Sequence, residues 1–225
     1  MQLTHHIRVA AIGAALLVAA FLSGTQFGVA QDVSPDQLLL KVSDLPQGAQ
    51  VQIQGPLTPG AWSNGFVNKD GTDIVQGYID GARADFMVPL VQVESTSGTQ
   101  SMARTYIANF VYRFADRRSA ANEFQRLQSV FSSAATPTDA GSSGRQSVIF
   151  EVGGDEEVPY ATMRWLFVLR GKFLIVLAMP GPLQNSALGA AKQSNDMPLT
   201  EQAIDGYNQA IDDLFAANMA LLQGR

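Results

Sequence analysis

The chain has 225 residues, with 15 Lys and Arg against 20 Asp and Glu, a formal net charge of −5 and no cysteine. An acidic surface repels phosphate groups, which makes nucleic acid and anionic membranes poor partners. The two histidines are His5 and His6. Beyond residue 6 the chain therefore cannot build Ser-His-Asp or Cys-His nucleophiles, thiolate redox chemistry or the usual zinc sites.

The N-terminal residues have the features of a signal peptide. Arg8 provides a positive charge, residues 9–22 are apolar, and residues 28–30 are Gly-Val-Ala, which suits cleavage. The apolar run is shorter than the roughly 20 residues needed to span a membrane. We expect residues 1–30 to be removed and residues 31–225 to form one exported domain, periplasmic or extracellular and without stable membrane insertion. An uncleaved membrane anchor is the alternative.

A short helix is predicted to open the mature domain. Ser34 suits the N-cap position, Pro35 the first helical position, and Gln37 completes a capping box. The apolar face expected for this helix consists of Leu38, Leu39, Leu40 and Val42. Asp44-Leu45-Pro46 is expected to end it.

Strands with intervening turns are predicted next. Residues 50–54 alternate Gln with Val and Ile, which predicts a half-buried strand. Residues 55–65 are rich in Pro and Gly and predict a loop, and Asp70-Gly71 predicts a tight hairpin turn. Weak strand character runs through Ile74–Ile79 and then Phe86–Val93, and the polar run 94–100 predicts a turn.

Residues 102–114 are rich in aromatic and β-branched side chains and predict a strong strand. Asp116 or Ser119 then caps a helix. The buried stripe expected for this helix recurs at helical spacing and consists of Ala120, Phe124, Leu127 and Phe131. Residues 132–147 predict a mobile connection.

Three strands are predicted over 148–152, 160–169 and 173–178, with a hairpin at Arg170-Gly171-Lys172. Residues 173–177 are nearly all apolar, which indicates a central strand buried on both faces. Residues 180–198 predict a long loop. Thr200 then caps an amphipathic helix whose expected buried face is Ile204, Tyr207, Ile211, Leu214, Met219 and Leu222.

This order of elements predicts an α+β fold in a single domain. Hairpin connections outnumber crossovers, so the β-sheet is expected to be antiparallel or mixed, with helices packed mainly on one face. No internal repeat is present.

Candidate binding residues lie in the two long loops, because loops longer than a connection requires are often functional. Trp62 and Phe66 lie in or just after the first loop, and Gln184, Asn185 and Asn195 lie in the second. The aromatic rings suit stacking on a ligand, and the amides suit hydrogen bonding. No catalytic residue, metal ligand or cofactor is predicted.

Three segments resemble a loose class of uncharacterised exported bacterial domains, many of them lipoproteins or sensor ectodomains. They are the LL…DLP opening at 39–46, the strand-to-helix unit VYRFAD…A…F at 111–131, and the hairpin FVLRGKFLIV at 167–176. The resemblance implies an extracytoplasmic α+β fold that binds or senses. This chain lacks the cysteine that lipoproteins carry.

The favoured function is a non-enzymatic binding or sensor-like module that recognises a small ligand or an envelope protein. One alternative is a carboxylate-dependent hydrolase of the glycosidase type, because such enzymes need only paired acids. Its candidate acids are Asp70, Asp73, Asp155, Glu156 and Glu157. A second alternative is a structural or assembly protein of the envelope, whose mark would be an exposed apolar patch.

Overall fold

The computed structural model describes residues 33–57, 76–95, 97–139, 146–153, 161–183 and 200–224. From Ser34 onward these residues belong to one compact unit. They follow the predicted order of a short helix, strands, a helix, strands and a last helix. No helix among the described residues is both long enough and apolar enough to cross a membrane.

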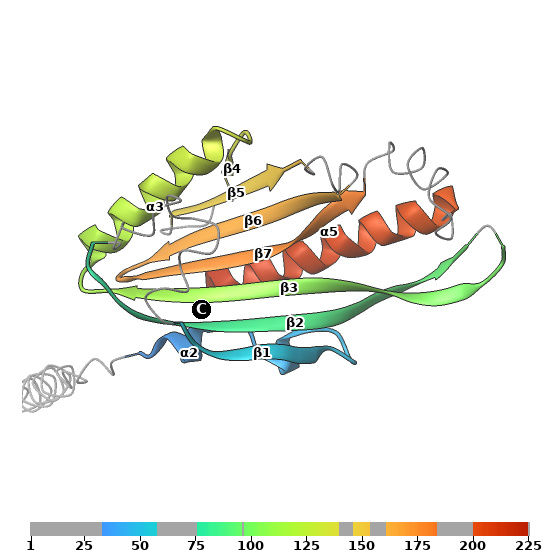
Figure 1. Ribbon diagram of the computed structural model, residues 1–225, viewed down its shortest axis with the longest axis horizontal. Helices are drawn as coiled ribbons and strands as arrows, with labels where there is room; N and C mark the ends of the chain where they lie inside the picture. Colours follow the sequence, from blue (N-terminus) through green and yellow to red (C-terminus); the bar gives the residue numbers. More distant parts are fainter. Residues whose placement is uncertain are drawn as a thin grey trace, which may run out of the picture. The chain divides into compact units, whose positions relative to one another are not determined.

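Seven strands of the described chain form one sheet, in the order β1-β2-β3-β7-β6-β5-β4 (Figure 1). Every neighbouring pair is antiparallel. The strands are β1 (Gln50–Leu57), β2 (Tyr78–Glu94), β3 (Gln100–Phe114), β4 (Thr138–Asp139), β5 (Gln146–Val152), β6 (Ala161–Arg170) and β7 (Phe173–Leu183). The predicted α+β class is confirmed, and the sheet is antiparallel.

β7 is the central strand of this sheet. It lies between β3 and β6, and its residues 173–179 are all buried. A strand covered on both faces can be apolar at every position because neither face meets water. The predicted hairpin between β6 and β7 is also confirmed. Gly171 in its turn has φ +56°, a conformation that glycine adopts at little cost.

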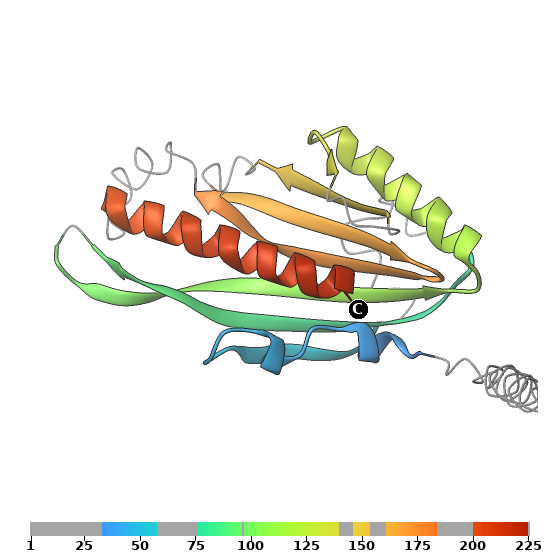
Figure 2. The same cartoon turned by 180° about the vertical axis from the view of Figure 1, so that it is seen from behind.

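The two long helices cover opposite faces of the sheet, as the two views show (Figures 1 and 2). Successive side chains of a strand point to opposite faces. In β6 the Trp165 ring packs on Phe131 of α3 (Arg117–Ser132), with centroids 5.5 Å apart. Its neighbour Arg164 forms an ion pair with Asp212 of α5 (Glu201–Gly224). The sheet therefore has an α3 face and an α5 face.

The α3 face holds an aromatic core. All four residues of the predicted stripe on α3 are buried, and Phe131 packs on Phe167 with ring centroids 5.0 Å apart. Asp116 is the N-cap, because its Oδ1 accepts a hydrogen bond of 2.7 Å from the Ser119 backbone N–H. That hydrogen bond lowers the pKa of the Asp116 carboxyl.

The first helix, α2 (Pro35–Leu38), is shorter than predicted. The capping box is present, since the Ser34 N–H donates to Gln37 Oε1 at 3.3 Å. Leu38, Leu39 and Leu40 are all buried, and the helix ends at Leu38 because Leu39 has an extended backbone, with ψ 152°. The prediction that Val42 is buried is wrong, because it lies in the 3₁₀ turn η1 (Val42–Asp44) and is 42% exposed.

The prediction of a half-buried first strand is also wrong. β1 is the end strand of the sheet, and residues 50–54 are exposed on both of its faces. Alternation of polar and apolar residues does not distinguish such a strand from one that covers a core. Both predicted loops begin later than expected, since β1 continues through Gly55–Leu57 and β7 through Pro180–Leu183. The remainder of both loops, and the predicted turn at Asp70-Gly71, lie outside the described residues.

The two weak strands predicted before residue 94 form a single strand of 17 residues, β2. β2 and β3 form a long hairpin, and the turn predicted at 94–100 joins them. β1 pairs with β2 only up to Met87, and β7 pairs with β3 only from Ala108. The hairpin therefore continues past the rest of the sheet as a two-stranded arm, formed by Val88–Glu94 and Gln100–Ile107.

Candidate functional site

The predicted site residues Trp62, Phe66, Gln184, Asn185 and Asn195 lie outside the described residues. The same holds for the five acids proposed for the hydrolase alternative, which are Asp70, Asp73, Asp155, Glu156 and Glu157. Their roles stay predictions. The candidate site described below is made by other residues.

A groove of about 740 Å³ lies between the arm and the first turns of α5. We call it the arm groove. From the arm it is lined by Val91, Gln92, Val93, Glu94 and Gln100, and from the helix side by Thr200, Gln202, Ala203, Asp205 and Gly206. Its volume falls within the range of about 300–1,000 Å³ that is typical of ligand sites.

Local hydrogen bonds hold the tip of the arm. The Ser95 N–H donates to the Thr99 carbonyl at 3.0 Å, and the Ser95 hydroxyl accepts from the Thr99 N–H at 3.1 Å. Gly98 has φ +79°, which a side chain would strain. Within the groove, Val93 is only 7% exposed. Its burial fixes the orientation of this end of β2, and therefore the directions in which the neighbouring side chains point.

The opposite wall is set by the start of α5. Thr200 caps the helix as predicted, because its Oγ1 accepts from the Ala203 N–H at 3.1 Å. Ala203 and Gly206 are the small residues of this wall, and a Cβ placed on Gly206 would meet nothing within 4 Å. The groove is therefore open at Gly206.

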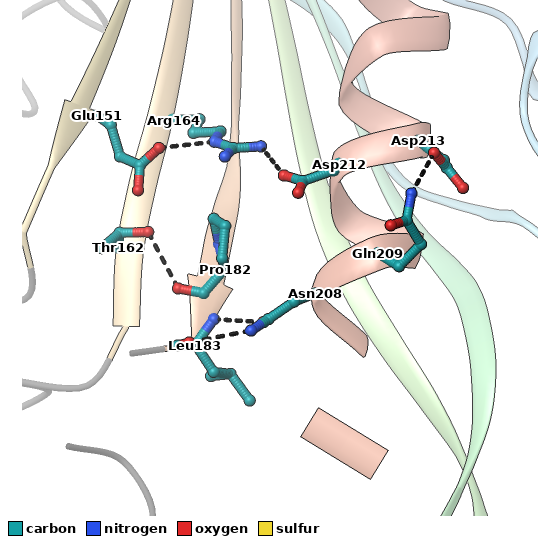
Figure 3. A network of polar contacts seen from close by, with 9 residues as sticks. All are labelled: Glu151, Thr162, Arg164, Pro182, Leu183, Asn208, Gln209, Asp212 and Asp213. Carbon is teal, nitrogen blue, oxygen red and sulfur yellow. Dashed lines mark hydrogen bonds and ion pairs between the residues drawn. The ribbon is translucent and has the colours of Figure 1, made fainter. Parts of the chain in front are cut away.

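Polar contacts fasten α5 to the sheet just after the groove (Figure 3). The Asn208 amide accepts from the Leu183 N–H at 2.7 Å and donates to the Leu183 carbonyl at 3.1 Å. One turn later, Arg164 of β6 bridges Glu151 of β5 and Asp212 of α5. Burial by itself lowers the pKa of the Arg164 guanidinium, but its hydrogen bonds to both carboxylates outweigh this and leave that pKa raised.

Tyr207 follows the groove residues on α5 and is partly buried against the arm. Burial raises the pKa of its phenol.

The lining residues determine what the arm groove can bind. Gln92, Gln100 and Gln202 can each donate and accept hydrogen bonds, and Glu94 and Asp205 can accept them. Val91 and Val93 supply apolar contact. None of the described lining residues is Lys or Arg. Among the described residues, no group of three or more His, Cys, Asp or Glu could hold a metal ion.

A second polar cluster lies on the α3 face of the arm's base. Asp85 of β2 is fully buried and accepts hydrogen bonds from the Arg83 guanidinium, with Nε to Oδ1 at 2.7 Å, and from the Tyr106 hydroxyl. The Arg83 guanidinium also lies 5.2 Å from the Phe110 ring centroid. Because the Asp85 carboxylate is already paired by two donors, we interpret this cluster as structural.

The sequence prediction missed every residue of the arm groove. The signal that could have indicated this site is Gly206. Glycine inside an amphipathic helix destabilises the helix, so its presence there suggests a packing or functional role. Residues 86–93 are predicted as a weak strand and residues 94–100 as a turn. That Val91–Glu94 line a groove depends on α5, which lies more than 100 positions later in the chain.

No family model matches the chain, and no curated protein matches it. Among solved structures it is similar to the crystal structure of the extracellular domain of PknH from Mycobacterium tuberculosis. The two chains share 12% sequence identity, the match covers 80% of this chain and 97% of the other, and the TM-score is 0.43. A similarity at this level establishes neither a shared fold nor a shared function.

Proposed function

We propose that this protein is an exported, non-enzymatic binding module that holds its ligand in the arm groove. Export is proposed from the signal features of residues 1–30. Binding rather than catalysis is proposed because the chain beyond residue 6 has no histidine and no cysteine, which removes the commonest nucleophile systems.

The observation that carries this proposal is the composition of the arm groove. It combines an apolar floor at Val91 and Val93 with amides and carboxylates along its length. Ligand sites in proteins are typically apolar concavities with a few convergent polar groups that fix orientation. Both walls are also held in place, by the Ser95 turn on one side and by the Asn208 contacts on the other.

Thermal unfolding of two variants at one position tests the proposal. Gly206→Leu places a side chain in the groove, whereas Gly206→Ala adds only a Cβ in open space and serves as the matched control. Pools of envelope peptides, glycan fragments and metabolites are screened against the wild-type protein. At 100 times its dissociation constant, a ligand adds about 2.7 kcal/mol of stability, which raises the Tm by about 5 °C or more.

We expect the wild-type protein and Gly206→Ala to show this rise and Gly206→Leu to lose it. A ligand that stabilises all three proteins equally would place the binding site elsewhere. Cleavage of a glycan by the wild-type protein, abolished in Glu94→Gln or Asp205→Asn, would instead favour the hydrolase alternative, because these two carboxylates line the same groove.

A further inference from the structure

One edge of β2 has no strand partner along the arm groove. β1 covers this edge from Gly81 to Met87 and then ends, while β2 continues to Glu94. Pro89, which has no N–H to donate, lies just after the point where β1 ends, as expected for proline at a sheet edge. Within the described chain, Gln92, Val93 and Glu94 pair on their other side with β3, and the register of that pairing shifts between Pro89 and Gln92.

This free edge faces α5. Both views show the end of β2 lying between β3 and the first turns of the helix (Figures 1 and 2). Four consecutive residues, Val91 to Glu94, line the groove. The groove therefore runs along this end of β2, next to the edge that β1 leaves unpaired.

An added strand requires room between the edge of β2 and the helix. Neighbouring strands lie about 4.8 Å apart, so an incoming strand must fit between the β2 edge and the helix. The helix wall contributes Ala203 and Gly206, the smallest residues available, and a Cβ at Gly206 meets nothing within 4 Å. The outward N–H and C=O groups of β2 are then available to pair with a second backbone.

The charge of the walls selects among extended peptides. Glu94 lies on the strand side and Asp205 on the helix side, and the described lining contains no Lys or Arg. A peptide with basic side chains complements these carboxylates, whereas an acidic peptide is repelled. Apolar β-branched side chains at alternate positions would lie over Val91 and Val93.

We propose that the arm groove takes an extended, basic peptide segment of a partner protein, which adds to the free edge of β2 as an extra strand. This inference rests on the proposed function, because it names the partner and the binding mode for the same groove. The main-chain hydrogen bonds supply affinity, and the carboxylates of Glu94 and Asp205 supply selectivity.

Three synthetic octapeptides test this inference on the folded protein. The first alternates valine with lysine, the second replaces lysine by glutamate, and the third keeps the first sequence but carries N-methyl groups on alternate backbone nitrogens. Affinity is measured by calorimetry, and amide hydrogen exchange is followed at Leu90–Glu94. We expect the first peptide to slow exchange there at least tenfold, and the other two to bind at least tenfold more weakly.

Charge variants supply the matched control. Asp205→Lys should lower the affinity for the valine–lysine peptide at least tenfold. Asp213→Lys, which reverses an exposed charge on the same helix outside the groove, should leave affinity within about twofold. Equal losses in both variants would indicate a general charge effect and would overturn the proposed selectivity.

The outcomes separate this inference from the proposed function. If the N-methylated peptide binds as well as its parent, strand addition is wrong while binding in the groove stands. If no peptide binds but another compound loses binding in Gly206→Leu, the peptide inference fails and the proposed function survives. If nothing stabilises the wild-type protein, both fail.

Discussion

At the scale of single residues, β2 carries two Arg–Asp pairs that differ mainly in burial. Asp85 is fully buried and paired with Arg83, whereas Asp80 is 42% exposed and paired with Arg113 of β3. A buried carboxylate has no access to water, so its partners alone stabilise its charge. Breaking an exposed ion pair costs little free energy, because water replaces the lost partner.

Removing each carboxylate should therefore have different effects. Asp85→Ala leaves the Arg83 guanidinium and the Tyr106 hydroxyl without their shared acceptor, and we expect it to lower the free energy of unfolding by about 3 kcal/mol. Asp80→Ala, its matched control in the same strand, should cost less than about 1 kcal/mol. Urea denaturation measures both, and similar costs would show that burial does not distinguish the pairs.

At the scale of elements, α5 takes the place of a strand where β3 and β7 diverge. The last pair between these strands is Ala108 with Ala178, and beyond it β7 continues to Leu183 with β6 as its strand partner. The Asn208 amide satisfies both backbone groups of Leu183, as a neighbouring strand would. This contact holds the helix that forms one wall of the arm groove.

Asn208→Ala should loosen this wall. Two backbone groups lose their partners, which we expect to cost about 2 kcal/mol and to speed hydrogen exchange at the Leu183 amide. The control is Gln209→Ala, which removes only an exposed contact to Asp213. It should lower the free energy of unfolding by about 0.3 kcal/mol. Unchanged exchange at Leu183 in Asn208→Ala would show that the amide does not hold the helix.

At the scale of the whole molecule, a sheet covered on both faces buries several ionisable side chains. Burial is the main cause that raises the phenol pKa of Tyr78, Tyr112 and Tyr207, and Tyr112 is shifted furthest. A buried phenol favours its neutral form because its charged form loses hydration. These tyrosines keep their protons in the folded protein at pH values where the unfolded chain releases them.

Stability should therefore fall in alkaline solution. Unfolded tyrosines ionise near pH 10, so above about pH 10 the folded state binds more protons than the unfolded state and the free energy of unfolding decreases with rising pH. Each such group contributes a slope of at most about 1.4 kcal/mol per pH unit. Tyr112→Phe should make the slope between pH 9 and pH 11 shallower, measured by urea denaturation. An unchanged slope would contradict the assignment to Tyr112.

The sequence alone determined the structure wherever a local pattern is compatible with only one backbone conformation. Thr200 caps α5, and Asp116, one of two predicted candidates, caps α3, because a short polar side chain satisfies free N–H groups. Gly171 turns the β6–β7 hairpin because it tolerates a positive φ. The uninterrupted apolar run at 173–177 fixed the central strand. These signals lie within a few residues of one another, so no distant contact was needed to interpret them.

Only the tertiary structure decided which surfaces are exposed and where a groove forms. The alternation at residues 50–54 predicted a buried face, but these residues of β1 are exposed on both faces. Val91 and Gly206 line one groove because the hairpin continues past its neighbouring strands and α5 returns beside it. Such a site depends on residues far apart in sequence, and local patterns contain no information about which of them will meet.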